Sequence, residues 1–237
     1  MGGFDGVLSN RFLRSLPKEV ARRLVKVSEQ APMTRGAIVV EAGAFPAHIY
    51  FPDRGLLSLV KPMSDGRTAE VGFVGVEGLS NVSALMGVPL SPFDVVVQLE
   101  GHAIRIATAD LRREMEASPV LSKLVVRYLY FKMSQLAQTA ACNRLHSLRQ
   151  RCCRWLLLAH DNAREDEFTL THEFLALMMG VNRPALTLTL SGLQKHGHVR
   201  YRRASLHIVD RASLEDGACE CYATLRDDLD RVYADLR

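Results

Sequence analysis

The stretch from Thr171 to His198, THEFLALMMGVNRPALTLTLSGLQKHGH, constrains this chain most strongly because it reads as two short helices joined by a tight turn. Gly180 can adopt the positive φ that ends the first helix, and Asn182 can cap the second. Ala176 is small enough for the two helices to cross closely. We therefore predict a helix-turn-helix here; the competing interpretation is an ordinary helical hairpin in a core.

The predicted second helix, about residues 183–196, has two different faces. Its leucines recur at i, i+4 and i+7, which predicts a stripe facing the core: Leu186, Leu190 and Leu193. The opposite face carries small or polar side chains and a lysine: Pro184, Thr187, Leu188, Ser191 and Lys195. A helix that buries one stripe and presents such a surface suits the major groove of DNA.

Composition limits the alternatives. The chain has 237 residues, enough for two ordinary domains, and its net charge of +4 is modest, so any nucleic-acid surface has to be local. It has no run of 18 apolar residues and no apolar signal segment, so we expect a cytoplasmic protein with no membrane partner. Since no G-x-S-x-G, H-E-x-x-H, P-loop or G-x-G-x-x-G motif occurs, we do not expect an enzyme.

The N-terminal half is typical of a β domain. Residues 1–15 read as a loose lead-in, and Pro17 begins a predicted helix over residues 17–30. Short β-branched or alternating runs then follow between about residues 30 and 108, which predicts an antiparallel sandwich or barrel. The clearest hairpin joins residues 56–63 to 68–74 through Ser64-Asp65-Gly66.

Ser118-Pro119 is a helix-start signal, and the helix that follows has apolar residues on more than one face. A helix gains from being apolar on several faces only if it is buried twice, so we predict that one face covers the β domain and another pairs with a second copy. The predicted dimerisation residues are Leu121, Leu124, Val125, Tyr128, Leu129, Met133 and Leu136.

The helix-turn-helix is embedded in further predicted elements. A helix from about residue 147 to 160 and a short strand over residues 168–170 precede it. Residues 199–203 and 206–209 alternate as a small hairpin turning at Ala204-Ser205, which makes the unit a winged helix. Arg200, Arg202 and Arg203 can bracket phosphates beside the groove. A helix closes the chain.

This order of elements resembles the Crp/Fnr family of bacterial transcription regulators. The most specific stretch is TLTHEFLALMMGVNRPALTLTLSGLQKHGHVRYRRASLHIVD, supported by RCCRWLLLAHD upstream and by HIYFPDRGLLSLVKPMSDGRTAEVGFVGVEG in the β domain. The resemblance implies an α+β fold: a cyclic-nucleotide-binding-like antiparallel β-roll (jelly roll) over residues 1–112, a dimerisation helix over 113–145 and a winged-helix DNA-binding domain over 146–237. It also implies a homodimer that binds a palindromic double-stranded DNA site and contacts RNA polymerase.

The resemblance also assigns DNA contacts. Arg183 matches the family position whose arginine contacts guanine, the commonest specific contact. Pro184 and Leu188 stand where relatives often carry Glu and Arg, and they can only touch thymine methyl groups. The other predicted contacts, to phosphates or base edges, are Thr169, Thr171, His172, Asn182, Thr187 and Lys195.

The effector pocket of the family is only partly matched. Gly75, Glu77 and Gly78 stand near its ribose-binding element, and Tyr128 faces it from the long helix. The phosphate-binding element reads Ser91-Pro92-Phe93-Asp94-Val95 and has no arginine. A buried phosphate beside a carboxylate and without a guanidinium is uncompensated, so we do not expect cyclic AMP. Two alternatives stay open: the pocket takes another small-molecule effector, whose identity the sequence does not name, or it is filled by side chains.

The five cysteines begin only at Cys142, so the N-terminal cluster of the iron–sulfur branch is missing and we expect no such cluster. His48 and His102, the candidates for a haem ligand, are read as surface strand residues. His207 lies near Cys219-Glu220-Cys221 in sequence, but the two cysteines alone are two well-spaced ligands short of a zinc site, so no metal or other cofactor is predicted. One alternative stays open: a thiol- or metal-responsive sensor that uses Cys142, Cys152, Cys153, Cys219 and Cys221 and has DNA binding as its output.

Overall fold

The structure is a computed structural model and describes residues 9–234. Its N-terminal half contains α1 (Arg11–Arg14), α2 (Lys18–Lys26), β1 (Ser28–Met33), β2 (Ile38–Val40), β3 (His48–Pro62), β4 (Thr68–Val74), α3 (Val82–Leu85), β5 (Asp94–Ala107) and α4 (Thr108–Ala117). Its C-terminal half contains α5 (Pro119–Leu145), α6 (Leu148–Ala163), β6 (Glu167–Thr169), α7 (His172–Met179), α8 (Arg183–Lys195), β7 (Val199–Arg202), β8 (Ser205–Ile208), α9 (Arg211–Gly217) and α10 (Cys221–Tyr233). No helix in the described range is long and apolar enough to cross a membrane.

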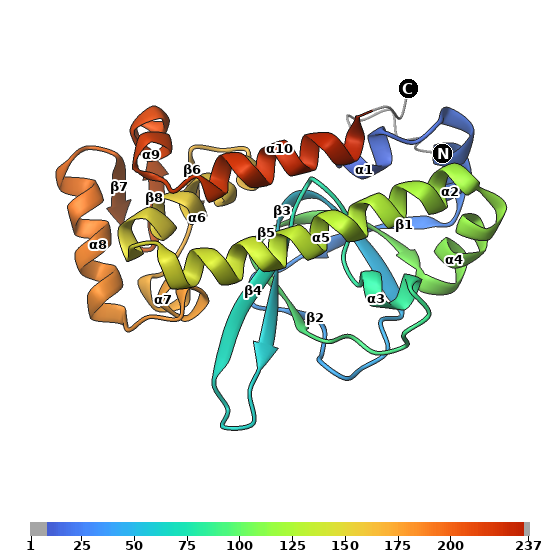
Figure 1. Cartoon of the computed structure of the whole chain (residues 1–237), viewed down its shortest axis with the longest axis horizontal. Helices are drawn as coiled ribbons and strands as arrows, with labels where there is room; N and C mark the ends of the chain where they lie inside the picture. Colours follow the sequence, from blue (N-terminus) through green and yellow to red (C-terminus); the bar gives the residue numbers. More distant parts are fainter. Residues whose placement is uncertain (1–8, 235–237) are drawn as a thin grey trace.

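The predicted β domain is an antiparallel sheet of order β1-β5-β3-β4, with β2 also paired to β5. Runs predicted as separate strands merge into the two long strands β3 and β5, which bend together where their register shifts near Arg54. Only glycine fits at this bend, because a Cβ on Gly101 would lie 2.2 Å from the carbonyl oxygen of Arg54. The predicted β3–β4 hairpin is confirmed and projects from the sheet (Figure 1).

Two predictions in the N-terminal segment are wrong. The helix predicted over residues 17–30 ends at Lys26, and Ser28–Met33 is the edge strand β1, paired with β5. Here strand pairing overrides the local helical pattern. The predicted lead-in contains α1, whose Phe12 and Leu13 are buried against the roll; residues 1–8 of that lead-in lie outside the described part of the chain.

The long helix α5 begins as predicted: the Ser118 hydroxyl accepts the Leu121 backbone N–H, and Pro119 is the first residue. It lies across the roll, with α10 alongside it (Figure 1). Part of the predicted dimer surface is wrong, because Leu121, Leu124, Val125 and Tyr128 are fully buried within their own chain. These four side chains pack into the roll and cannot meet a second copy.

The predicted winged helix is present, with α6 capped by a Ser147–Gln150 capping box and a small sheet of order β6-β8-β7. It packs directly on the roll: Leu56 and Phe73 share a core with Trp155 of α6, and α7 contacts β4. The roll and the winged helix therefore meet through apolar side chains as well as through α5.

The turn of the wing lies one residue earlier than predicted, at Arg203-Ala204, between β7 and β8. Both residues have positive φ, 49° and 66°, because a two-residue hairpin turn that matches the strand twist requires it. An alanine in this left-handed conformation is strained.

We predict that Ala204→Gly raises the free energy of unfolding by about 0.5–1 kcal/mol, because glycine relieves this strain. Denaturant unfolding measures the change. Ala223→Gly, on the exposed face of α10, is the matched control and is expected to lower the same quantity. An unchanged or lowered stability for Ala204→Gly would argue against the strained turn.

Candidate nucleic-acid interface

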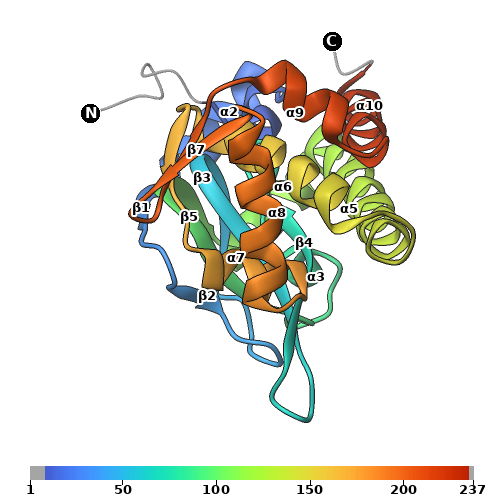
Figure 2. The same cartoon turned by 90° about the vertical axis from the view of Figure 1, so that its left-hand side faces the viewer.

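The helix-turn-helix has the Gly180 turn and the Asn182 cap that its sequence predicts, and it has a further cap at Thr171 that was not predicted. Thr171 caps α7 by accepting the Phe174 N–H, and α7 ends at Gly180 with φ 63°. Asn182 then caps α8 by accepting the Ala185 N–H at 2.9 Å. These hydrogen bonds define where the two helices begin, and α8 lies at one end of the molecule (Figures 1 and 2).

The faces of α8 are arranged as predicted. The leucines of the stripe are at most 2% exposed: Leu186, Leu190 and Leu193. Arg183, Pro184 and Lys195 are exposed on the outer face, and Leu188 is 76% exposed.

Thr187 and His172 lie in one cluster that the sequence did not predict. The His172 Nδ1 lies 2.9 Å from the Thr187 hydroxyl, and the imidazole stacks on Tyr201 of the wing with ring centroids 4.3 Å apart. The His172 Nε2 is buried and has no partner among the described residues. Neither ring nitrogen is thus free at the surface, so His172 joins α7, α8 and the wing rather than facing a phosphate.

Partial burial, followed by the positive charge of Arg183, lowers the pKa of His172 below its ordinary value of 6.5. Because the unfolded chain then binds the proton more readily, the stability that neutral His172 contributes to the fold is complete above pH 6.5 and is lost as the pH falls below it.

We predict that the melting temperature falls less between pH 7.5 and 5.5 in His172→Asn than in the unsubstituted protein. The surface substitution His196→Asn should keep the full dependence, and equal curves for all three proteins would rule out this role.

The wing places three further cations beside α8 (Figure 2). Arg200, Arg202 and Arg203 are all exposed. Their side chains form no hydrogen bond or ion pair within residues 9–234, and the same holds for the side chains of Arg183 and Lys195. Thr169, at the end of β6, is exposed nearby, and Thr171 is half-buried as the α7 cap. Several arginines elsewhere do pair with carboxylates, as Arg211 does with Asp161 and Arg23 does with Glu114.

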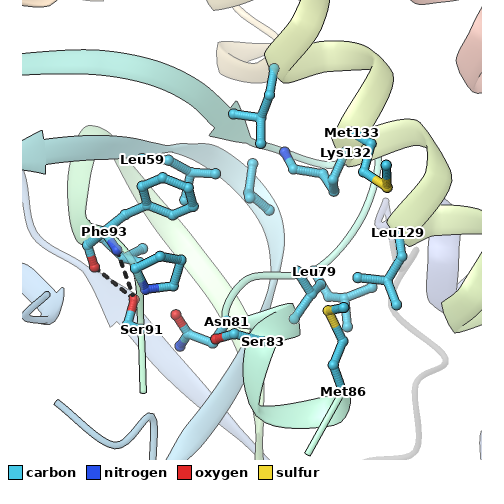
Figure 3. Close-up of a pocket in the computed structure, with 15 residues that line it drawn as sticks. Leu59, Leu79, Asn81, Ser83, Met86, Ser91, Phe93, Leu129, Lys132 and Met133 are labelled. Carbon is cyan, nitrogen blue, oxygen red and sulfur yellow. Dashed lines mark hydrogen bonds between the residues drawn. The ribbon is translucent and has the colours of Figure 1, made fainter. Parts of the chain in front are cut away.

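The roll contains an apolar cavity of about 230 Å³ against α5. Leu59 and Phe93 of the sheet face Met133 and Lys132 of the helix across it (Figure 3). Lys132 supplies the positive charge: its ammonium donates to the Phe73 carbonyl and to Gln135 Oε1 at 2.6 Å, and burial lowers its pKa to about 8.

The four residues predicted for an effector pocket do not line this cavity. Gly78 packs on the Tyr128 ring so closely that a Cβ would lie 2.1 Å from it, and the Tyr128 hydroxyl lies 3.4 Å from the Glu77 carboxylate. Glu77 also accepts the Gly75 N–H at 2.7 Å, and it borders a second cavity of about 290 Å³. The first cavity instead runs along the Ser91-Pro92-Phe93 element, which has no arginine.

Comparisons with known proteins agree with this architecture. Residues 150–216 match the Crp-like helix-turn-helix domain. A comparison with curated proteins gives no significant match.

Solved structures share the fold over nearly the whole chain. FixK2 from Bradyrhizobium japonicum is 12% identical, with a TM-score of 0.67 over 81% of this chain and 98% of its own. A CRP-family transcriptional regulator from Thermus thermophilus is 21% identical, with a TM-score of 0.63 over 79% and 96%. A Crp/Fnr-family transcriptional regulator from Eubacterium rectale is 17% identical, with a TM-score of 0.61 over 88% and 97%. The resemblance and fold class drawn from the sequence are thereby confirmed: the protein has the fold of the Crp/Fnr transcription regulators, and its residues 150–216 match the Crp-like helix-turn-helix domain.

Proposed function

We propose that this protein is a homodimeric transcription regulator that binds palindromic DNA, with α8 in the major groove and the wing on the flanking backbone. Arg183 contacts guanine at the start of α8, while Pro184 and Leu188 touch thymine methyl groups. Asn182 and Thr187 complete the surface of α8, and Arg200, Arg202 and Arg203 hold phosphates. Contact with RNA polymerase follows from the family resemblance alone.

The observation that carries this proposal is the set of five cations without intramolecular partners around α8. Leaving five such groups unpaired on one surface is repulsive unless a polyanion covers them. Two of them lie on one helix and three on one hairpin, and a helix that enters a groove with a hairpin on the flanking backbone uses such groups to contact base edges and phosphates. The family match supports DNA as that polyanion.

A second copy of the chain has an obvious place on α5. One face of this helix carries exposed residues that are separated alternately by four and three positions: Val126, Tyr130, Met133, Ala137 and Ala140. This heptad spacing is that of a coiled-coil seam. Tyr130 and Met133 are 66% and 71% exposed, which costs free energy in a monomer. We infer that two α5 helices pair along this seam, and Leu129 and Leu136 lie half-buried at its border.

An effector would sit in the apolar cavity behind the same helix. Met133 belongs both to the lining of the cavity and to the seam, so a ligand that moves it changes the pairing of the two α5 helices. The lining contains Lys132 as its cation and no arginine. We therefore do not propose cyclic AMP as the effector, since its phosphate would lack a bidentate partner.

The salt dependence of DNA binding tests the role of the wing. We expect Arg202→Ala to weaken binding to all sequences and to lower the slope of log K against log salt by about 0.9 for each phosphate that the wing no longer neutralises. Fluorescence anisotropy with a labelled duplex at several salt concentrations measures this slope. Arg112→Ala, an exposed arginine of α4, is the control. If both variants keep the original slope, the wing does not contact the backbone.

A further inference from the structure

Four potential metal ligands meet where the long helix ends. Cys142 and His146 lie one helical turn apart at the C-terminus of α5, and Cys219 and Cys221 flank the start of α10. Their ligand atoms all lie within 4.8 Å of one another. The sequence offered only the Cys219-Glu220-Cys221 pair with His207; the fold replaces His207 by two residues more than 70 positions upstream.

The spacing of these atoms fits one tetrahedral ion. Zinc binds thiolates at about 2.3 Å and imidazole nitrogen at about 2.0–2.1 Å, so adjacent ligands of a tetrahedron lie about 3.5–3.8 Å apart. The Cys142 and Cys219 sulfurs are 3.5 Å apart, and the Cys221 sulfur lies 3.5 Å from His146 Nδ1. A disulfide requires about 2.05 Å and would leave the third thiol and the imidazole unexplained.

The surroundings orient the ligands as metal sites require. His146 Nε2 lies 3.2 Å from the Glu220 carboxylate, an arrangement in which Nε2 carries the proton and Nδ1, 3.5 Å from the Cys221 sulfur, offers its lone pair to a metal. Gln138 Nε2 donates to the Cys221 sulfur at 2.9 Å, a hydrogen bond that stabilises a thiolate. The three cysteines are buried in a cluster of their own, apart from the aliphatic cores. A thiol that serves only as packing needs neither of these polar partners.

We propose that Cys142, His146, Cys219 and Cys221 form a binding site for a zinc-class divalent cation. Three sulfurs and one nitrogen in a closed tetrahedron leave no open position, so the site is structural and not catalytic. Binding releases the thiol protons of the cysteines to solvent, and no electron transfer takes place.

The position of the site gives it a specific consequence. The chain turns at His146-Ser147 from α5 into α6, the first helix of the winged-helix unit, while α10 returns along α5. An ion held by both α5 and α10 fixes this junction from two sides. Loading or removing the ion therefore changes how firmly α8 is held relative to α5. This consequence rests on the proposed DNA binding, whereas the metal site itself does not.

Metal content of the full-length protein tests the site without any use of DNA. Protein purified under reducing conditions, stripped with a chelator and reloaded with Zn²⁺ is expected to bind one ion per chain by atomic emission. Co²⁺ in place of Zn²⁺ is expected to give the intense absorption of thiolate-to-metal charge transfer and the visible bands of a tetrahedral ion. Zn²⁺ should also raise the melting temperature.

Cys221→Ala is expected to bind Zn²⁺ at least 100-fold more weakly, whereas Cys152→Ala, a buried thiol of α6 outside the cluster, should keep the ion. His146→Gln should retain the thiolate absorption with an altered visible spectrum.

Three results would each overturn the proposal: no ion in the unsubstituted protein, an octahedral Co²⁺ spectrum, or equal loading of Cys221→Ala and the unsubstituted protein. So would a Cys142–Cys219 disulfide found by mass spectrometry in protein that takes up no ion. If Cys221→Ala does not fold, the Co²⁺ spectrum of the unsubstituted protein decides alone.

Discussion

The substitution Met133→Glu is expected to convert the protein from a dimer into a monomer. Met133 lies in the middle of the exposed seam of α5 and is 71% exposed in the single chain, so glutamate is tolerated there until a second copy approaches. In the proposed dimer the two carboxylates would face each other across the two-fold axis and lose their water. Such a juxtaposition costs several kcal/mol, which corresponds to a dimer dissociation constant at least 100-fold higher.

Analytical ultracentrifugation across a range of protein concentrations measures this shift. Val120→Glu is the matched control, because Val120 is an exposed apolar residue of the same helix outside the seam. Both variants should melt cooperatively, which shows that the substitution acts on assembly and not on the chain. A Met133→Glu protein that dimerises as tightly as the control would remove the seam from the interface. DNA affinity should fall together with dimerisation, because a monomer binds only one half-site.

The second large effect is expected from Arg183→Ala, which should weaken binding to the preferred sequence by about 1–3 kcal/mol for each half-site. Arg183 is the exposed first residue of α8 and has no partner within residues 9–234. A guanidinium can donate two hydrogen bonds to guanine, and this pair of bonds distinguishes guanine from every other base. The loss should therefore be confined to sites with the preferred base pair at one position of each half-site.

Arg183→Lys separates this contact from simple charge, because lysine keeps the cation but not the planar pair of donors. Binding of both variants to the preferred site and to single-base variants of it is measured by anisotropy. If Arg183→Ala lowers the affinity for all sequences equally and Arg183→Lys restores it, Arg183 contacts a phosphate and base recognition lies elsewhere on α8.

The helix-turn-helix could be predicted from the sequence because its signals are local. Caps such as Asn182, the turn at Gly180 and the leucine spacing of α8 all act within a few residues. The start of α5 at Ser118-Pro119 was predictable for the same reason. Strand β1 was not, because Ser28–Met33 carries no strand signal and is held in the sheet only by pairing with β5.

The faces of α5 could not be assigned from the sequence. Apolar residues lie all round this helix, and periodicity does not say which of them the roll covers and which it leaves exposed. Tyr128 is fully buried, and Tyr130, two residues later, is 66% exposed. The metal ligands were hidden for a related reason: Cys142 and Cys219 are brought together only because α10 returns along α5.

Selection from a pool of random double-stranded DNA with the full-length protein tests the central claim most directly. The proposed homodimer predicts enrichment of an inverted repeat whose half-sites are centred about 10 base pairs apart, or a multiple of that distance, with a conserved guanine in each half. Introducing Arg183→Ala should relax that guanine and leave the symmetry in place. A pool that shows no enrichment, or one enriched in a sequence without two-fold symmetry, would contradict DNA recognition by a dimer through α8.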